Sequence, residues 1–390
     1  MNVCAFSTTK FQTISLLGRR LIATFAAVSS LSALCAEPMP FTIYAPSRNG
    51  NELLVLKLTP KPEGKAPGKL AELKLESSHD LRFPARTIAQ HPTEPVLYLS
   101  GSGKAGESKT NLAVRRLDPE TNEIKWGVFG VFERDYSYMS VDRSGKYLLG
   151  CNYRDGIVDV YRLNKDQVPE AEPVATVSEG LKAAHCVLAS PDNRHIYIPY
   201  VKDSNALLQY EFDEKSGTLT ALDPKNANPP AGTGPRHLAY HPELPILYFS
   251  EEQGLGISVY QRDPKSGQLT YSTTVRATGD DAPEKGVSAS DIVMTPNAKF
   301  IYTGIRGHAH DYDFVAGYAI QKDGGLKPIG LTETSKIPWG LAVSPDGHYL
   351  VVTAYDGAEI IVYQIDQNDG TLIKAASLPV DEGISDVETR

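Results

Sequence analysis

Four residues in the middle of this 390-residue chain are of the types that can add water to a carbonyl group: His185, Arg236, Glu252 and Arg306. A histidine whose pKa is near its ordinary value of about 6.5 can take a proton from the attacking water. An arginine can stabilise the charge that develops on the carbonyl oxygen, or hold a carboxylate or phosphate with two hydrogen bonds. A glutamate can orient that arginine or act as the acid.

Each of these residues also has a simpler structural interpretation. Arg236 and Glu252 could form an ion pair at the end of a strand. His185 could be a hydrogen-bonded turn residue, and Arg306 could anchor the loop that follows it. The four residues are spread over 121 positions, so a common site requires a fold that brings distant segments together.

A turn-and-strand module that recurs about every fifty residues indicates such a fold. The second residue of each turn falls at positions 92, 142, 191, 242, 296 and 345. Each turn is followed by segments of five to seven residues in which Tyr, Val, Ile and Leu alternate with polar residues, a period typical of strands. No sustained helical period occurs after the N-terminal segment. Four strands per unit at this period predict a β-propeller.

The number of modules predicts seven blades, with six or eight as the alternatives. Seven copies of the outer strands can be recognised, but only six inner turns. The chain therefore enters blade 1 partway, at Phe41–Tyr44, and the segment Gly383–Glu388 would supply the innermost strand of that blade. We expect an all-β, seven-bladed propeller of four-stranded antiparallel blades, closed by pairing the N- and C-terminal strands in blade 1 so that no edge stays open.

The first 36 residues are expected to be a signal peptide, and residues 37–390 a single propeller domain. Lys10, Arg19 and Arg20 precede an apolar stretch, Leu21–Leu34, and a plausible cleavage site follows at Ala36. The apolar stretch is shorter than the roughly 20 residues that span a bilayer. We therefore expect an exported protein, periplasmic or secreted, without a membrane span. The general and the twin-arginine export routes both fit this segment.

Composition excludes several classes of function. Removal of residues 1–36 takes away three positive charges and changes the formal net charge from −8 to −11, which disfavours binding to nucleic acids. No Cys/His set has the spacing of metal ligands, and no Gly-rich phosphate loop is present, so neither a metal nor a cofactor is expected. The expected partner is a small molecule, and we expect the protein to be a monomer.

The repeat also gives each residue a position within its module, here called the repeat ruler, which is counted from the second residue of each turn as zero. Offset −6 holds Arg86, Tyr136, His185, Arg236, Ser290 and Trp339, and offset +10 holds Ser102, Asn152, Val201, Glu252, Arg306 and Tyr355. A hairpin centred near +2 would pair −6 with +10 across two strands at one end of the propeller. Almost all of these side chains are polar or aromatic, as a small-molecule pocket requires, although strand ends are polar in any protein. We expect substrate contacts from Arg86, Tyr136, Asn152, His237, Trp339 and Tyr355.

The chain resembles the seven-bladed propeller lactonases, a family that includes bacterial 6-phosphogluconolactonase and the fungal carboxy-muconate lactonizing enzymes. The resemblance covers about residues 41–388 and rests on Ala184-His185, Gly234-Pro235-Arg236-His237, Glu252 and Arg306-Gly307. It implies that the active-site groups proposed for the family correspond to His185, Arg236, Glu252 and Arg306. Trp339 departs from the pattern, because the family often has an arginine there.

These features favour a cofactor-independent hydrolase of a sugar lactone, similar to 6-phosphogluconolactonase. Export weakens the assignment of that particular substrate, although the arginines could serve an anionic lactone. Two alternatives stay open: a non-enzymatic exported propeller that binds a ligand or partner, and a cycloisomerase that acts on muconate-like diacids. The loop His308–Asp313 could contact substrate or, less simply, hold a metal. There is no Gly-x-Ser-x-Gly motif, so serine catalysis is not supported.

Overall fold

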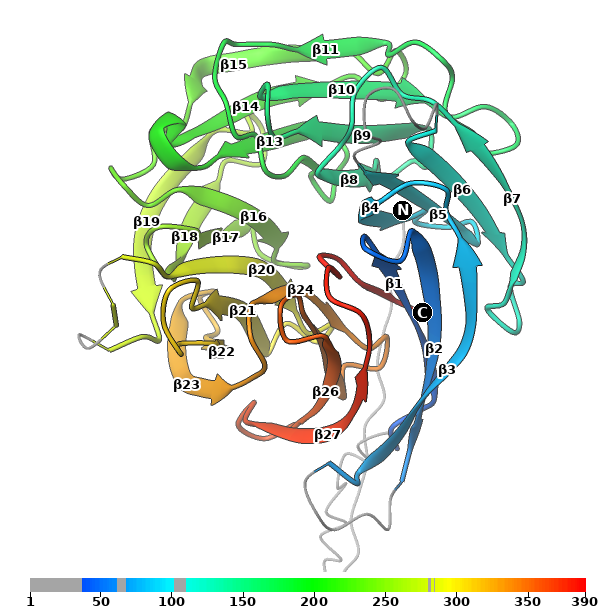
Figure 1. The fold of residues 1–390 in the computed structure, drawn as a ribbon. Helices are drawn as coiled ribbons and strands as arrows, with labels where there is room; N and C mark the ends of the chain where they lie inside the picture. The colour runs from blue at the N-terminus through cyan, green and yellow to red at the C-terminus, as the bar shows by residue number, and fades with distance from the viewer. Residues whose placement is uncertain (1–36, 62–67, 102–109, 280–281, 284) are drawn as a thin grey trace, which may run out of the picture. The chain divides into compact units, whose positions relative to one another are not determined.

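Strands arranged in seven sheets make up nearly all of the regular structure. The computed structural model describes residues 37–61, 68–101, 110–279, 282–283 and 285–390, so the predicted signal peptide and Ser102 lie outside the described residues. Within that part of the chain every sheet has four strands, and all pairings between named strands are antiparallel. The sheets follow one another around a centre (Figure 1). The predicted seven-bladed β-propeller is therefore confirmed.

The first three blades come from residues 41–177 and the C-terminal strand. From its innermost to its outermost strand, blade 1 contains β28 (Glu388–Thr389), β1 (Phe41–Ser47), β2 (Glu52–Pro60) and β3 (Ala71–Asp80). In the same order, blade 2 contains β4 (Ala85–Gln90), β5 (Val96–Gly101), β6 (Leu112–Leu117) and β7 (Ile124–Gly130). Blade 3 contains β8 (Tyr138–Val141), β9 (Tyr147–Asn152), β10 (Ile157–Arg162) and β11 (Ala175–Val177).

Blade 4 contains β12 (Leu188–Ala189), β13 (His195–Tyr200), β14 (Ala206–Phe212) and β15 (Leu219–Asn226), with a single 3₁₀ turn at Lys202–Ser204. Blade 5 contains β16 (Pro235–Tyr240), β17 (Ile246–Glu251), β18 (Gly256–Arg262) and β19 (Leu269–Arg276). Blade 6 contains β20 (Ser288–Met294), β21 (Phe300–Arg306), β22 (Phe314–Ile320) and β23 (Leu326–Glu333). Blade 7 contains β24 (Pro338–Val343), β25 (Tyr349–Ala354), β26 (Glu359–Ile365) and β27 (Leu372–Pro379).

The two ends of the propeller meet in blade 1, as predicted. Ile43 pairs with Thr389 and Tyr44 pairs with Glu388, and Figure 1 shows the red C-terminal segment beside the blue first strands. The closing strand is shorter than the predicted Gly383–Glu388, because only an isolated bridge between Ser47 and Ile384 precedes it. This closure joins the last blade to the first and protects both from edge-to-edge association.

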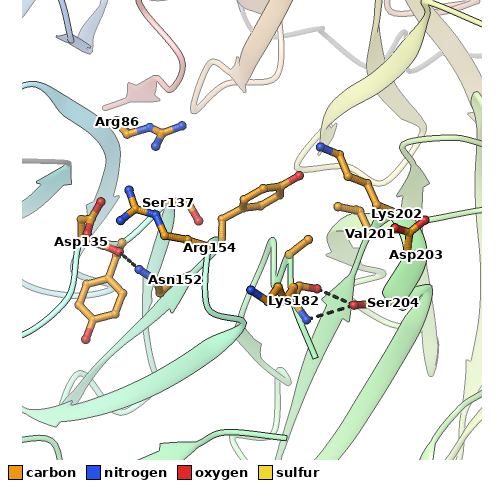
Figure 2. Close-up of a pocket in the computed structure, with 13 residues that line it drawn as sticks. Arg86, Asp135, Ser137, Asn152, Arg154, Lys182, Val201, Lys202, Asp203 and Ser204 are labelled. Atoms are coloured by element: carbon orange, nitrogen blue, oxygen red, sulfur yellow. Dashed lines mark hydrogen bonds between the residues drawn. The ribbon is translucent and has the colours of Figure 1, made fainter. Parts of the chain in front are cut away.

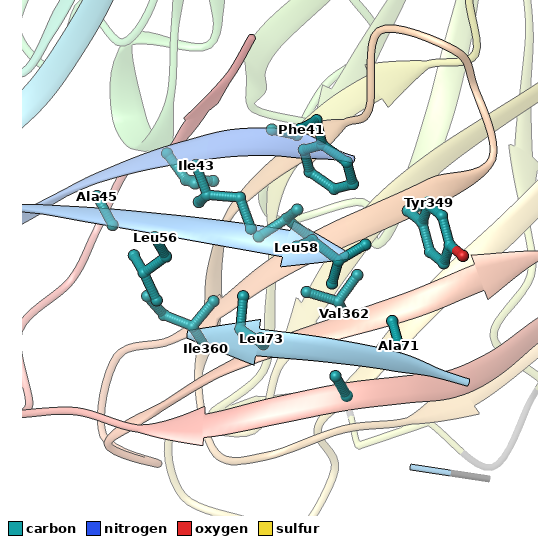
Figure 3. Packing of buried hydrophobic residues seen from close by; sticks show 14 of the residues in the cluster. Phe41, Ile43, Ala45, Leu56, Leu58, Ala71, Leu73, Tyr349, Ile360 and Val362 are labelled. Carbon is teal, nitrogen blue, oxygen red and sulfur yellow. The ribbon is translucent and has the colours of Figure 1, made fainter. Parts of the chain in front are cut away.

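Apolar contacts between neighbouring blades form the core. At the closing interface, Ile43 and Leu56 of blade 1 pack against Ile360 and Val362 of blade 7 (Figure 3). These four side chains are no more than 5% exposed. Because strand side chains alternate between two faces, each blade can bury one face against the blade before it and the other against the blade after it. The alternating pattern in the sequence thus encodes the interfaces between blades.

A recurring tyrosine strengthens these interfaces at six positions. In each case the phenol of a buried tyrosine on the second strand donates a hydrogen bond to a carbonyl in the outer turn of the next blade. The pairs are Tyr44–Asn122, Tyr98–Gln167, Tyr147–Lys215, Tyr197–Gly267, Tyr248–Gly324 and Tyr302–Gly370, at 2.5–3.0 Å. A buried hydroxyl without such a partner would be costly. The repeat therefore encodes directional contacts as well as apolar packing.

Candidate active site

Eight of the ten predicted site residues line one pocket of about 490 Å³. They are His185, Arg236, Glu252, Arg306, Arg86, His237, Trp339 and Tyr355. The lining also includes residues that were not predicted from the sequence, among them Arg48, Tyr153, Lys202 and Ser288. The propeller thus brings together most of the residues that the repeat ruler placed at one end of the molecule.

The strand register differs from the predicted pairing of −6 with +10. In blades 2, 4, 5, 6 and 7 the residue at −7 lies opposite the residue at +9; Pro235 and Glu251 are an example. In blades 5, 6 and 7 the register then shifts, so that −6 and −5 both fall in a β-bulge. A bulge leaves residues unpaired and re-aims their side chains. Arg236 and His237 occupy one such bulge and therefore both reach the pocket.

A glycine sets the entry into the bulge of blade 5. Gly234 has a backbone φ of 62°, which a residue with a Cβ adopts only with strain, and an added Cβ would clash with the Gln253 side chain. Its N–H donates to Asn205 Oδ1 at 2.8 Å, and its carbonyl accepts from the Glu252 N–H at 2.7 Å. The Gly-Pro-Arg-His segment therefore ties the start of β16 directly to the residue that carries the Glu252 carboxylate.

Glu252 is the centre of the charged cluster. Its Oε2 atom lies 3.8 Å from His185 Nε2, 3.4 Å from Arg236 Nε and 3.6 Å from Arg306 Nη2. All four residues are buried, with exposed fractions between 1% and 9%. The ion pair of Arg236 with Glu252 that the sequence suggested thus exists, but it belongs to a larger group inside a pocket rather than to an isolated strand end.

The two arginines carry unused hydrogen-bonding capacity. Within the described part of the chain, Arg236 Nε and Nη1 and Arg306 Nε have no hydrogen-bond partner. The contact of Arg236 Nε with Glu252 is close but not aligned as a hydrogen bond. Burial, and then repulsion from Arg236, lowers the pKa of Arg306 to about 9. Buried charges with spare donors are unfavourable unless an anionic or polar ligand completes them.

His185 is poised as a neutral imidazole. Burial lowers its pKa well below the ordinary value, and Arg236 lowers it further. Its Nδ1 atom lies 3.1 Å from Nε2 of His237, and the ring of Tyr153 packs edge-on against it. The other nitrogen of His237 lies 2.7 Å from Asp291. Asp291 was not predicted from the sequence, although it occupies the same offset, −5, in blade 6 that His237 occupies in blade 5.

Trp339 presents an aromatic surface to the charged cluster. Its ring lies 4.7 Å from the Arg306 guanidinium and 4.8 Å from the ring of Tyr355. The hydroxyl of Tyr355 accepts a hydrogen bond from Arg48 Nη1 at 3.1 Å. An arginine at position 339 would repel Arg306, whereas the tryptophan face attracts it. The departure from the family pattern is therefore compatible with the rest of the cluster.

Tyr136 and Asn152 are the two predicted substrate-binding residues that lie outside this pocket. They line an adjoining pocket of about 430 Å³, shown in Figure 2, and their polar groups are already used. The Tyr136 hydroxyl donates to Asp159 at 2.6 Å, and Asn152 Nδ2 donates to the Asp135 carbonyl at 2.7 Å. These contacts hold blade 3 together. Asp142 N–H bonds to the Tyr147 carbonyl as Ser190 N–H bonds to the His195 carbonyl, so Asp142 is the first residue of its turn and the predicted offsets in blade 3 are one residue out. Ser137 and Tyr153 hold the equivalent positions, and both line the first pocket.

The first residue of the His308–Asp313 loop, His308, lines the pocket. His308 Nε2 lies 2.7 Å from Ser288 Oγ, whereas the Asp313 carboxylate accepts the backbone N–H groups of Gly307 and Ile337. Among the described residues no three His, Cys, Asp or Glu side chains are placed to hold a metal ion. The same residues include no helix of the length and apolarity needed to cross a membrane.

Comparison with known proteins gives the same architecture. The 6-phosphogluconolactonase of Pectobacterium carotovorum is 29% identical over 252 residues, which is 63% of this chain and 72% of that protein. The 6-phosphogluconolactonase of Cronobacter sakazakii is 29% identical over 248 residues, again 63% and 72%. The structure of the periplasmic gluconolactonase of Pseudomonas aeruginosa superposes with a TM-score of 0.77 and 19% identity, over 90% of this chain and 99% of that one.

The family model described as "Lactonase, 7-bladed beta-propeller" matches residues 48–385. That range includes every predicted site residue and six of the seven blades in full. The chain belongs to the seven-bladed β-propeller lactonase family.

Proposed function

We propose that this protein is a cofactor-independent hydrolase of a sugar lactone, and that the reaction takes place at Glu252 and its three partners. The observation that carries the proposal is the convergence of one neutral histidine and two under-satisfied arginines on a single carboxylate in a pocket. Membership of the lactonase family supports the reaction class. The names of the related proteins, 6-phosphogluconolactonase and gluconolactonase, support a sugar lactone as the substrate.

In the proposed mechanism, water attacks the lactone carbonyl carbon while His185 Nε2 takes its proton. The new C–O bond produces a tetrahedral oxyanion, and the free donors of Arg236 and Arg306 stabilise it. The ring C–O bond then breaks, and the leaving alkoxide takes the proton from the imidazolium. The product is the open hydroxy acid. Glu252 holds the two arginines in place and stabilises the imidazolium through its 3.8 Å contact with Nε2.

The charge of the pocket supports an anionic sugar lactone in particular. Arg48 and Arg86 line it, and Arg86 also lines the adjoining pocket, where Figure 2 shows it near Arg154. Burial lowers the pKa of Arg86, and repulsion from Arg48 and Arg154 lowers it further, which reflects crowding of like charges. A carboxylate or phosphate on the substrate would relieve that crowding. A sugar lactone that carries either a phosphate or a carboxylate fits this chemistry.

The test is a panel of sugar and aliphatic lactones, assayed for acid release with the wild type, His185→Gln and Arg236→Met. Loss of the general base should lower kcat by about 10²–10⁴-fold, and loss of an oxyanion donor by about 10²–10³-fold. His241→Asn is the matched control, because its ring accepts backbone N–H groups in the turn of blade 5 that follows β16. Absence of any rate above spontaneous hydrolysis in the wild type would leave a ligand-binding propeller instead.

Export to the periplasm or the medium remains part of the proposal. It rests on the charged and apolar pattern of residues 1–36. A related structure is that of a protein named periplasmic. Fractionation of cells that express the full chain, followed by N-terminal sequencing, would detect cleavage after Ala36. Full-length protein in the cytoplasm would contradict the prediction.

A further inference from the structure

A line of hydrogen bonds runs from His185 around the ring of blades, away from Glu252. His185 Nδ1 lies 3.1 Å from His237 Nε2, and His237 Nδ1 lies 2.7 Å from Asp291 Oδ1. The three residues come from blades 4, 5 and 6. Asp291 itself is fixed by two backbone N–H groups, those of Ile292 at 2.8 Å and Leu341 at 3.0 Å. Neither histidine is more than 9% exposed.

The positions of the protons follow from the ends of this line. An ionised carboxylate only accepts hydrogen bonds, so His237 Nδ1 must carry a proton toward Asp291. Burial lowers the pKa of His237 to about 4, so its ring is neutral at pH 7 and its Nε2 is an acceptor. His185 Nδ1 must then donate to that nitrogen. His185 is also neutral, so its Nε2, which faces Glu252, carries the lone pair.

We infer that Asp291 and His237 are positioning residues that hold His185 in the tautomer with a bare Nε2 and stabilise the imidazolium formed there during turnover. The inference rests on the proposed function of His185 as the base. In the other tautomer Nε2 would carry a proton and could not accept one from water. Without the line, nothing among the described contacts of His185 Nδ1 would select between the two forms.

The same fold contains a natural comparison for Asp291. Asp386, near the closing strand, accepts the N–H groups of Val387 and Ile88 at 2.9 Å each. It therefore repeats the contact of Asp291 with its own following residue and with the inner strand of the next blade. Within the described part of the chain, Asp386 makes no hydrogen bond to a histidine. The backbone role of the aspartate is thus separable from its role toward His237.

Several other groups face the two histidines and bear on their titration. Arg236 and Arg306 disfavour protonation of both rings, and Glu252 lies 3.8 Å from Nε2 of His185. Tyr153 packs on His185, and Tyr138 packs on His237 at 4.8 Å. Lys202 approaches the Tyr153 ring, and Cys186 is buried beside Tyr138. None of these groups lies along the bonds between His185, His237 and Asp291.

The first test reads the tautomers directly. In wild-type protein with ¹⁵N-labelled histidine, long-range ¹H–¹⁵N spectra should show both rings protonated at Nδ1 at pH 7, with the His237 proton shifted far downfield by the short bond to Asp291. His185→Gln and His237→Gln provide the assignments. Protonation of His185 at Nε2 would overturn the inference without reference to any activity.

The second test uses Asp291→Asn. Because an amide can donate where the carboxylate only accepted, we expect the downfield resonance to vanish, kcat to fall by about 10²–10⁴-fold and KM to stay within about threefold. Asp386→Asn should keep the resonance. Because burial raises the pKa of Asp386 to about 7, an amide should replace that carboxyl group at a smaller cost in thermal stability. An unchanged kcat in folded Asp291→Asn protein would overturn the positioning role of Asp291. If the wild-type protein shows the expected tautomers but hydrolyses no lactone, the proposed function is wrong, while the assignment of protons to His185 and His237 still holds.

Discussion

Blades 4–6 and blade 3 use adjacent repeat positions in different ways. In blades 4–6 the polar atoms of His185, Arg236 and Glu252 converge across blades and leave donors unsatisfied inside a pocket. In blade 3 the residues at offsets −6 and +10 are Ser137 and Tyr153, which line the pocket. Tyr136 and Asn152 each stand one position earlier, and they bond to groups close by in the same part of the fold. Because side chains alternate along a strand, a shift of one position turns a side chain away from the pocket.

The register explains much of this contrast. The −7 residue lies opposite +9 in five blades, as for Ala184 and Tyr200 in blade 4, and in blades 2, 4, 5 and 7 the residue at −6 then lines the pocket. In blade 3 the inner strand begins only at Tyr138, which pairs with Cys151. Tyr136 precedes that strand and packs among Phe132 and Tyr161. Substitutions of residues that line the pocket can therefore be compared with substitutions of residues, such as Tyr136, that only stabilise the fold.

The largest effect is expected for Glu252→Gln. The change leaves the buried guanidinium groups of Arg236 and Arg306 without their shared carboxylate. We expect kcat/KM to fall at least about 10³-fold, because His185, Arg236 and Arg306 lose the carboxylate that positions them. We also expect the free energy of unfolding to fall by up to about 3–5 kcal/mol. Lactone kinetics and urea unfolding at pH 7 would measure the two effects.

Glu251→Gln is the matched control for that experiment. Glu251 is the preceding residue, is 1% exposed, and bonds through Oε1 to Thr274. Burial raises the pKa of its carboxyl group, so an amide replaces it more easily. We expect a change of no more than about 1 kcal/mol in the free energy of unfolding. Equal losses in the two variants would mean that Glu252, too, serves only the fold.

The second effect concerns stability toward acid. The unfolded chain binds a proton at His237 near pH 6.5, but the folded protein does so only near pH 4. Between these values the unfolded state binds more protons, so the free energy of unfolding falls as the pH falls; above pH 6.5 His237 contributes nothing. The full loss is on the order of 3 kcal/mol for a shift from 6.5 to about 4. His237→Gln should flatten this slope in urea titrations from pH 7 to 4.

An exposed histidine gives the comparison for the acid experiment. The His310 ring lies at the surface, and its Nε2 bonds to the Lys285 carbonyl at 2.9 Å. His310→Gln should keep the slope of the wild type. If His237→Gln kept it as well, the ring of His237 would have to be solvated, and the contrast between the buried and exposed histidines would be lost.

Arg86 tests whether the boundary between the two pockets recognises charge. With Arg86→Gln we expect KM for a lactone that carries a carboxylate or phosphate to rise about tenfold, the value of one charge-assisted hydrogen bond. KM for a neutral lactone should not change. Arg143→Gln is the control, since Arg143 lies in the inner turn of blade 3, over the Tyr240 ring. Equal rises for charged and neutral lactones would remove Arg86 from anion recognition.

These comparisons also show what could be predicted from the sequence. The blade count followed from a period and an alternation that are local properties of the chain, and the closing strand followed from a missing copy. The bulges could not be predicted, because they depend on pairing between strands. Asp291 could have been found from its offset, which it shares with His237, but nothing in the sequence showed that two bulges on adjacent blades would bring these side chains within 2.7 Å.

The smallest effect is expected for a pair of tyrosine variants. Tyr136→Phe removes a hydroxyl that bonds to Asp159 and Tyr161 at 2.6 and 2.8 Å, so it should lower the free energy of unfolding by about 1–2 kcal/mol and leave lactone kinetics unchanged. Tyr153→Phe alters a ring that lines both pockets and packs on His185. It should change KM or kcat by a few-fold with little effect on stability. Because each variant removes one oxygen atom, a reversal of the two outcomes would place the binding surface at Tyr136 rather than at Tyr153.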